Sequence, residues 1–167
     1  MKNNIKIDKV KIGDENILAY IQTEAWKEAF SKIISNEDME KYTDINKAKE
    51  MYTMILNEKI GNGFILSIDG NPHCIAYFDK SRDDEFKDYA EIICIHSLAS
   101  NWGNGYGSIM MKHILKEIKE SGFNKVMLWV FEENNRARKF YEKHGFILSD
   151  KTKEFCDSIE VMYFREL

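Results

Sequence analysis

Apolar and polar positions repeat with two different periods along this chain, and the change of period separates predicted strands from predicted helices. Near the start, Ile5 and Ile7 alternate with lysines, which predicts a first strand with one solvated face. From Asp14 the apolar residues recur at steps of three and four, which predicts a helix. A second helical pattern covers roughly residues 46–58. We expect these two helices to lie between the first and second strands.

A hairpin and a central strand are predicted next. The runs Phe64–Ile68 and His73–Phe78 flank Asp69-Gly70, and Asp-Gly between apolar runs is a strong hairpin signal. A charged loop over residues 80–88 leads into Tyr89–His96, whose β-branched apolar residues are typical of a buried strand.

A crossover unit follows the central strand. After Gly107 the apolar residues return to helical spacing, and Gly122 lies where a helix C-cap is expected. The next strand is predicted at Val126–Val130, and a strand, a helix and a strand within about forty residues indicate a parallel, right-handed crossover. The remaining elements are predicted as a helix over Asn134–His144 and strands over Phe146–Leu148 and Ile159–Phe164.

Composition and net charge indicate one folded domain and disfavour several classes of partner. The 167 residues are 44% hydrophobic and 31% charged, so we expect one folded domain over residues 1–167. The net charge is -4 and the 24 Lys and Arg residues are dispersed, which disfavours a nucleic-acid partner. No apolar run has the length of a signal peptide or a membrane span, so we expect a cytoplasmic protein without a membrane partner. The three cysteines form no close pair, which predicts free thiols and no metal site.

Glycines alternate with other residues in Asn101–Ser108, which joins the predicted central strand to the following helix. Such a turn points several N–H groups into one concavity, and the helix start favours an anion there. The residues after Gly107 lack the lysine of a triphosphate loop, and Ser108 replaces the third glycine of a dinucleotide loop. The pattern predicts an anion cradle, with a plain strand-to-helix turn as the alternative. The cradle residues are Gly103, Asn104, Gly105, Tyr106, Gly107 and Ser108.

Two segments carry a family resemblance. Glu91–Met111 contains the glycine loop, and Asn134–Phe146 matches N-x-x-A-x-x-F-Y-E-K-x-G-F at every fixed position. Together they are similar to the GNAT N-acetyltransferase superfamily, and Ala25–Phe30 resembles the first helix of many bacterial members. The resemblance implies a mixed α/β fold: a central twisted, mostly antiparallel sheet of about seven strands, one parallel β-α-β crossover, and helices on both faces. It also implies direct transfer of acetyl from acetyl-CoA to a primary amine of a small molecule or peptide, in a ternary complex.

The resemblance assigns roles to single residues. Tyr141 stands where family members commonly place the general acid, and a packed aromatic is its alternative. Asn134 is the expected helix cap and a cofactor contact. Ile95 and Ser97 lie where the backbone of the fourth strand bonds to the pantetheine arm. One departure is Trp102, which occupies the place of Gln or Arg in the family pattern Q/R-x-x-G-x-G/A.

The general base has two candidates. Glu91 lies sixteen residues before Gly107, an offset similar to that of the general-base glutamate in the histone-acetylating branch, and a solvated strand-start carboxylate is its alternative. His96 is the second candidate, although a histidine within a strand is more often a packing residue. Cys94 is disfavoured as a covalent acyl carrier because no partner constellation is evident.

The acceptor side has weaker signals. Trp26 and Phe30 on the first helix are candidates for lining the acceptor pocket, and a core-facing helix explains them equally well. A catalytically silent CoA-binding sensor on the same fold is the alternative function, because fold does not determine activity. The sequence leaves open the identity of the amine, the acyl length, and whether the protein is a monomer or a homodimer.

Overall fold

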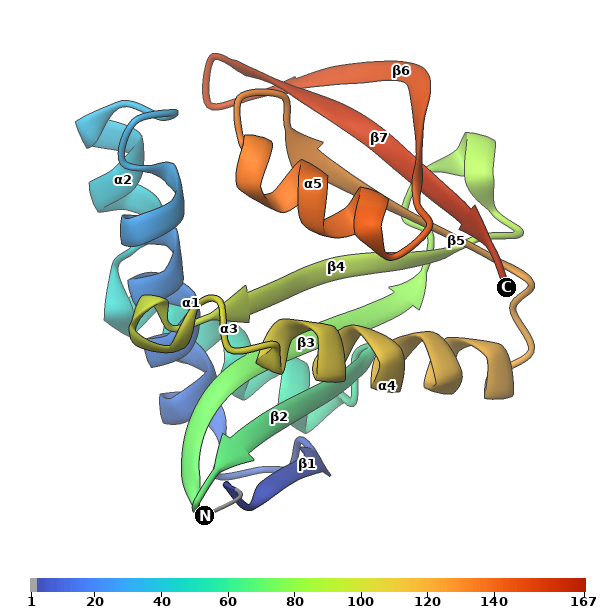
Figure 1. Ribbon diagram of the computed structural model, residues 1–167. Coiled ribbons are helices and arrows are strands. Elements are labelled where there is room, and N and C mark those ends of the chain that lie inside the picture. The colour runs from blue at the N-terminus through green and yellow to red at the C-terminus, as the bar shows by residue number, and fades with distance from the viewer. Residues whose placement is uncertain (1–2) are drawn as a thin grey trace.

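The computed structural model describes residues 3–167, which form one mixed sheet with helices on both faces (Figure 1). Within these residues the strand order is β1-β2-β3-β4-β5-β7-β6, and β4 and β5 are the one parallel pair. The fold class expected from the sequence is therefore confirmed. The strands are β1 (Ile5–Lys9), β2 (Asn62–Ile68), β3 (Asn71–Lys80), β4 (Ala90–Ser97), β5 (Lys125–Phe131), β6 (Ile147–Phe155) and β7 (Ser158–Glu166).

Three helices, one more than predicted, separate β1 from β2. The predicted pair are α1 (Glu15–Phe30) and α3 (Ile45–Glu58), and α2 (Asn36–Tyr42) lies between them. The sequence pattern missed α2 because none of its seven residues is buried, so it has no apolar period. Its one local signal is Ser35, whose hydroxyl accepts the N–H of Asp38 as an N-cap. The later helices are α4 (Tyr106–Glu120) and α5 (Asn135–Lys143), with short 3-10 turns at Asp84–Phe86 and Ala99–Asn101.

The last hairpin is longer than the sequence pattern predicted. Strand β6 extends to Phe155, whereas the apolar run ends at Leu148. Because β6 is an edge strand with mostly exposed side chains, hydrophobic alternation does not mark it.

Two hydrophobic cores lie on opposite faces of the sheet. On one face α4 packs its apolar side, including Met110 and Ile114, against Ala76 and Leu128 of the sheet, and Tyr141 of α5 joins this core. The opposite core contains Leu18, Ala19 and Ile21 of α1, Ala48, Tyr52 and Leu56 of α3, and Ile65, Ile75 and Tyr77 of the sheet. No helix among residues 3–167 has both the length and the apolar character that a membrane crossing requires.

Strands β4 and β5 pair only at their beginnings. Ala90 faces Val126 and Glu91 faces Met127, and past these residues the two strands have no pairing within the described chain. The parallel pair therefore opens toward the carboxyl ends of its strands. Open α/β sheets usually bind ligands at such a place.

A bulge in β4 changes which side chains face each core. Tyr77 of β3 lies opposite Cys94, whereas the next residue, Phe78, lies opposite Ile92. Ile93 is therefore the extra residue on β4, and the face of each later side chain is shifted by one position. As a result Cys94 lies on the sheet face covered by α1 and α3, together with His96 and Glu91.

Candidate active site

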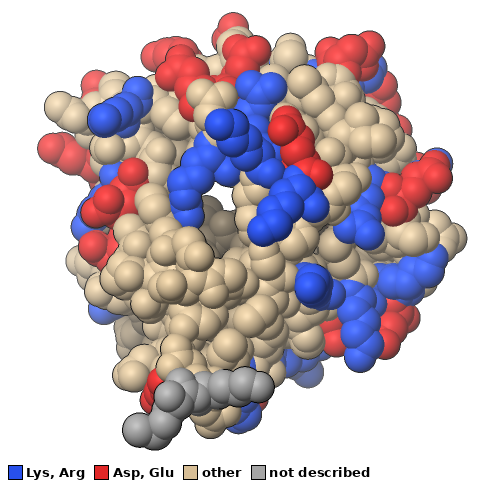
Figure 2. Space-filling model, in the orientation of Figure 1, with Lys and Arg blue, Asp and Glu red and all other residues tan. Residues whose placement is uncertain are grey.

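A cavity of about 450 Å³ lies where β4 and β5 separate. Its walls come from α1, β4, the loop before α4, β5, α5 and the β6–β7 hairpin. Figure 2 shows an opening in this face of the molecule with Lys and Arg side chains along its edge. Among the residues that line the cavity, Arg136 and Lys143 are positively charged and Glu160 supplies a carboxylate. The volume is typical of a small-molecule site.

The glycine loop presents unused N–H groups to this cavity. Helix α4 begins at Tyr106, and Gly103 and Gly105 have φ angles of 84° and 82°, which glycine adopts without strain. Within residues 3–167, no protein acceptor takes the N–H groups of residues 103–108. These groups carry the partial positive charge of a helix start, so the loop can bind an anion. Of the predicted cradle residues, all line the cavity except Asn104, which is exposed at the loop tip.

The backbone of β4 faces the cavity at two predicted positions. The N–H of Leu98 donates to the carbonyl of His73 on β3, and backbone groups alternate in direction along an antiparallel ladder. The alternation directs the polar groups of Ile95 and Ser97 away from β3, toward the separated β5. Both residues line the cavity. The carbonyl of Ser97 already accepts the indole N–H of Trp102 at 3.1 Å.

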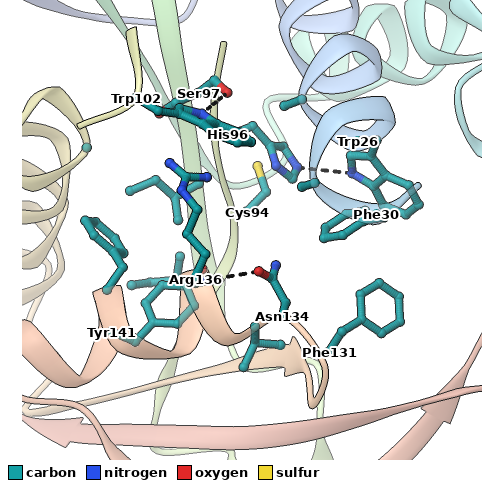
Figure 3. Close-up of a pocket in the computed structure, with 18 of the residues that line it drawn as sticks. Trp26, Phe30, Cys94, His96, Ser97, Trp102, Phe131, Asn134, Arg136 and Tyr141 are labelled. Carbon is teal, nitrogen blue, oxygen red and sulfur yellow. Dashed lines mark hydrogen bonds between the residues drawn. The ribbon is translucent and has the colours of Figure 1, made fainter. Parts of the chain in front are cut away.

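Trp102 holds an arginine in front of the glycine loop. The guanidinium carbon of Arg136 on α5 lies 3.3 Å from the centroid of the Trp102 ring, and Figure 3 shows the arginine reaching from its helix toward that ring. Stacking occupies the flat face of the guanidinium and leaves its N–H edges free to donate. Both residues line the cavity. In this chain the cation beside the loop therefore comes from Arg136 of α5, whereas the family pattern more often has Gln or Arg on the loop itself.

Tyr141 of α5 lies at the cavity wall beneath β4. Its ring packs against Phe140 and Phe146 with centroid distances of 5.6 and 5.9 Å, which holds its orientation. The hydroxyl has no hydrogen-bond partner among the described residues. Burial raises the pKa of Tyr141 above the usual value of a phenol, so the group is protonated at neutral pH. The structure thus brings a protonated, unbonded hydroxyl to the cavity.

Asn134 is both a helix cap and a cavity residue. Its Oδ1 accepts the N–H of Ala137 at 3.2 Å, which is the cap expected from the sequence. Its amide N–H₂ group has no partner within residues 3–167 and can donate into the cavity.

Glu91 is placed less favourably for acid–base chemistry. Its side chain is 4% exposed, does not line the cavity, and forms a bidentate pair with Arg82 at 2.6 and 3.2 Å. Burial by itself would raise the pKa of this carboxyl, but the hydrogen bonds and charge of Arg82 hold the pKa below its usual value. Such a carboxylate is a weak base that is already bonded, so the geometry does not favour Glu91 as the general base.

His96 and Cys94 line the cavity, but the structure favours neither a base role for His96 nor a nucleophile role for Cys94. Desolvation lowers the pKa of His96 to about 4, and its Nε2 accepts the indole N–H of Trp26 at 3.4 Å. Its lone pair is thus engaged, and the ring is neutral at physiological pH. Burial raises the pKa of the Cys94 thiol to about 12, which keeps the sulfur from acting as a nucleophile.

A second carboxylate is better placed than Glu91. Glu160 on β7 lies directly across from Phe131 on β5, lines the cavity, and is 16% exposed. Desolvation raises the pKa of Glu160, although the charge of Lys153 at 3.5 Å works against this shift. The result is a carboxylate that can accept and hold a proton closer to neutral pH than an ordinary one.

Trp26 and Phe30 line the cavity on the face covered by α1. Phe131 and Phe155 line the same region (Figure 3 shows Trp26, Phe30 and Phe131). The cavity therefore has two unlike sides, one of free N–H groups and arginine, the other of aromatic rings and one carboxylate.

Sequence comparison identifies the family. The model of the Acetyltransferase (GNAT) family matches residues 22–146, which include α1, the glycine loop and α5. The chain belongs to this family. Acetyl-CoA is the cosubstrate that GNAT acetyltransferases use, in agreement with the cofactor expected from the sequence. A search of curated proteins found no match.

Solved structures of GNAT proteins share the fold at low sequence identity. A PaiA N-acetyltransferase from Thermoplasma acidophilum, solved in complex with coenzyme A, has a TM-score of 0.79 at 19% identity, covering 95% of this chain and 98% of that one. A ribosomal-protein-alanine N-acetyltransferase from Brucella melitensis has a TM-score of 0.75 at 15% identity, covering 97% and 99%. A structure of yncA from Salmonella typhimurium with its cofactor acetyl-CoA has a TM-score of 0.73 at 14% identity, covering 97% and 93%.

Sequence reasoning missed several cavity residues of this GNAT chain. Arg136 falls on a variable position of the α5 pattern, so its role becomes visible only when Trp102 is seen beneath it. Glu160 and Phe155 lie in the final hairpin, which carries no family signature. A weak signal for Glu160 is its place as the one acidic residue within the apolar run Ile159–Phe164.

Proposed function

We propose that this protein transfers the acetyl group of acetyl-CoA to a primary amine, with both substrates in the cavity at once. Acetyl-CoA supplies a thioester whose carbonyl carbon accepts the amine nitrogen. Family membership supports acetyl transfer, and the two unlike sides of the cavity support direct attack without a covalent enzyme intermediate.

The residues present fit the diphosphate and the pantetheine arm of CoA. The N–H groups of residues 103–108 bind the diphosphate oxygens, and Arg136 on its Trp102 platform adds a fixed cation beside them. The backbone groups of Ile95 and the N–H of Ser97 bond to the amide groups of the arm, as an added strand would, whereas the Ser97 carbonyl stays bonded to Trp102. Asn134 donates its unused amide N–H to the same ligand.

Tyr141 is the proposed general acid. Its hydroxyl is protonated at neutral pH and gives its proton to the sulfur as the carbon–sulfur bond breaks and the bonding electrons stay on sulfur. The nitrogen, now bonded to the carbonyl carbon, loses its second proton to the phenolate, which restores Tyr141. No further co-reactant is needed.

Glu160 is proposed as the group that takes the first proton from the ammonium form of the acceptor. It lines the cavity and has a raised pKa, whereas Glu91 is bonded to Arg82 outside the cavity. Proton transfer directly or through one water then leaves a neutral amine with a lone pair for attack, and Glu160 passes its proton to solvent before the next turnover.

One observation carries this proposal. The unused N–H groups at the start of α4, the protonated hydroxyl of Tyr141 and the carboxylate of Glu160 all border the same cavity. A site that only binds the cofactor would need the N–H groups, but neither the hydroxyl nor the carboxylate.

The test is release of free thiol from acetyl-CoA by the purified protein across a panel of primary amines, with product mass confirming acetylation. We expect thiol release that depends on the amine. If the protein binds CoA in a calorimeter but no amine in the panel increases thiol release, a silent acyl-CoA-binding sensor becomes the better description.

A further inference from the structure

Four aromatic rings form one side of the cavity, from elements far apart in the sequence. We call them the aromatic wall: Trp26 and Phe30 of α1, Phe131 of β5 and Phe155 of β6. Phe30 lies 5.0 Å from Trp26 and 5.1 Å from Phe131, and Phe155 lies 6.0 Å from Phe131 and 6.4 Å from Trp26. These centroid distances are those of mutually supporting rings, so the wall is continuous.

The aromatic wall is distinct from the two cores of the protein. None of its rings belongs to either buried cluster, and Trp26, Phe30 and Phe155 are only partly buried although they surround a cavity. Tyr42 of α2 supports the wall from behind, 5.6 Å from Trp26 and 5.2 Å from Phe155. Partly exposed rings that line a cavity keep apolar area available for a ligand.

One carboxylate, Glu160, lines the cavity beside the aromatic wall, and Lys153 lies 3.5 Å from it. Glu160 adjoins the wall through its cross-strand neighbour Phe131, and it is the one Asp or Glu among the described residues that line the cavity. His96 on this side is neutral and receives the indole N–H of Trp26. The other charged residues that line the cavity, Arg136 and Lys143, are cations, so neither can pair with a second positive charge on an acceptor.

On the basis of the proposed function, we propose that the acceptor is a primary monoamine carried on an apolar, preferably aromatic, group. The apolar group lies against the aromatic wall, and the ammonium is held by Glu160. A cation beside aromatic faces also gains from the ring quadrupoles. A polyamine fits poorly, because its second ammonium has no carboxylate within the described cavity lining.

The experiment compares four acceptors of the intact protein with saturating acetyl-CoA: 2-phenylethylamine, n-butylamine, 1,4-diaminobutane and a short peptide with a free N-terminus. We expect kcat/KM to be about 10- to 30-fold higher for 2-phenylethylamine than for n-butylamine, since burial of a phenyl ring contributes that much. The diamine should be the poorest. A diamine that equals or exceeds 2-phenylethylamine overturns the inference, as does a peptide N-terminus that exceeds it.

A substitution in the aromatic wall tests whether the wall causes the preference for 2-phenylethylamine. Phe155→Leu should reduce the ratio of kcat/KM between 2-phenylethylamine and n-butylamine about fivefold or more. Phe86→Leu is the matched control, because Phe86 packs on Tyr89 in a 3-10 turn and does not line the cavity; its ratio should equal that of the wild type. An unchanged ratio in folded, CoA-binding Phe155→Leu protein also overturns the inference.

The two proposals fail differently. If no amine is acetylated while CoA still binds, the proposed function is wrong and this inference falls with it. If amines are acetylated but the order of preference is reversed, acetyl transfer stands and only the assignment of the acceptor is overturned.

Discussion

The stack of Arg136 on Trp102 allows a sharp test of the cofactor site. Arg136→Met removes the cation while keeping a long apolar stem, and Trp102→Ala removes the platform while keeping the cation. Trp102→Ala also removes the donor that occupies the Ser97 carbonyl. If Arg136 binds the diphosphate, both changes weaken CoA binding, and the loss of the cation weakens it more.

The structure sets the expected magnitudes. Hydrogen bonds to a charged partner contribute about 1.5–3 kcal/mol, and solvent at this exposed helix position reduces that to about 1–2 kcal/mol, or roughly a 5- to 30-fold increase in Kd for Arg136→Met. A cation–π contact at an exposed site contributes about 0.5–1 kcal/mol, so Trp102→Ala should raise Kd roughly two- to fivefold. Arg136→Lys should fall between the wild type and Arg136→Met, because an ammonium lacks the planar fork that stacks.

Calorimetric titration with CoA and with pantetheine, which lacks the diphosphate, measures these effects. Arg136→Met should weaken CoA binding and leave pantetheine binding nearly unchanged, and its CoA affinity should depend less on salt than that of the wild type. Lys139→Met is the matched control, since Lys139 is an exposed cation of the same helix that does not line the cavity. Equal losses in Arg136→Met and Lys139→Met would refute a specific site and leave only a general charge effect.

Three further predictions follow from the titratable groups. Tyr141→Phe should lower kcat about 100-fold or more with little change in CoA affinity, because a general acid is lost; wild-type turnover in stopped-flow thiol release would exclude this residue from the chemistry. Lys153→Met should raise the pKa of Glu160 further, since the lysine charge now lowers it, and the acidic limb of the kcat/KM profile should therefore move to higher pH; an unmoved limb would argue against Glu160 as the base. Arg82→Ala leaves the buried carboxylate of Glu91 with only a backbone donor, so thermal melts at neutral pH should show a loss of about 2 kcal/mol and a Tm lower by roughly 4–8 °C. The pKa of Glu91 is depressed in the folded state, so its pairing stabilises the protein above the unfolded carboxyl pKa, and the difference should shrink as acid protonates the group; a constant difference down to about pH 3 would contradict this account.

The periodic pattern of apolar residues is sufficient to predict most elements of the fold. The strands and helices that carry a clear period of two or of three to four were predicted near their observed positions, because each buries one face against a core. Helix α2 and most of β6 were not, since one buries no residue fully and the other is an edge strand with mostly exposed side chains. The family pattern at Asn134–Phe146 predicts the position of Tyr141 on α5 and the cap of that helix.

Some features of the candidate site likewise follow from the sequence alone, and others depend on the tertiary structure. By itself the sequence determined the glycine loop, the cap at Asn134 and the place of Tyr141, because their roles depend on backbone conformation and helix position within short segments. Only the tertiary structure showed that Arg82 holds Glu91, that Glu160 faces the cavity instead, and that Arg136 stacks on Trp102. These pairs join residues on different elements, and the pKa of a carboxylate depends on which distant charge and how much protein surround it, which no local pattern specifies.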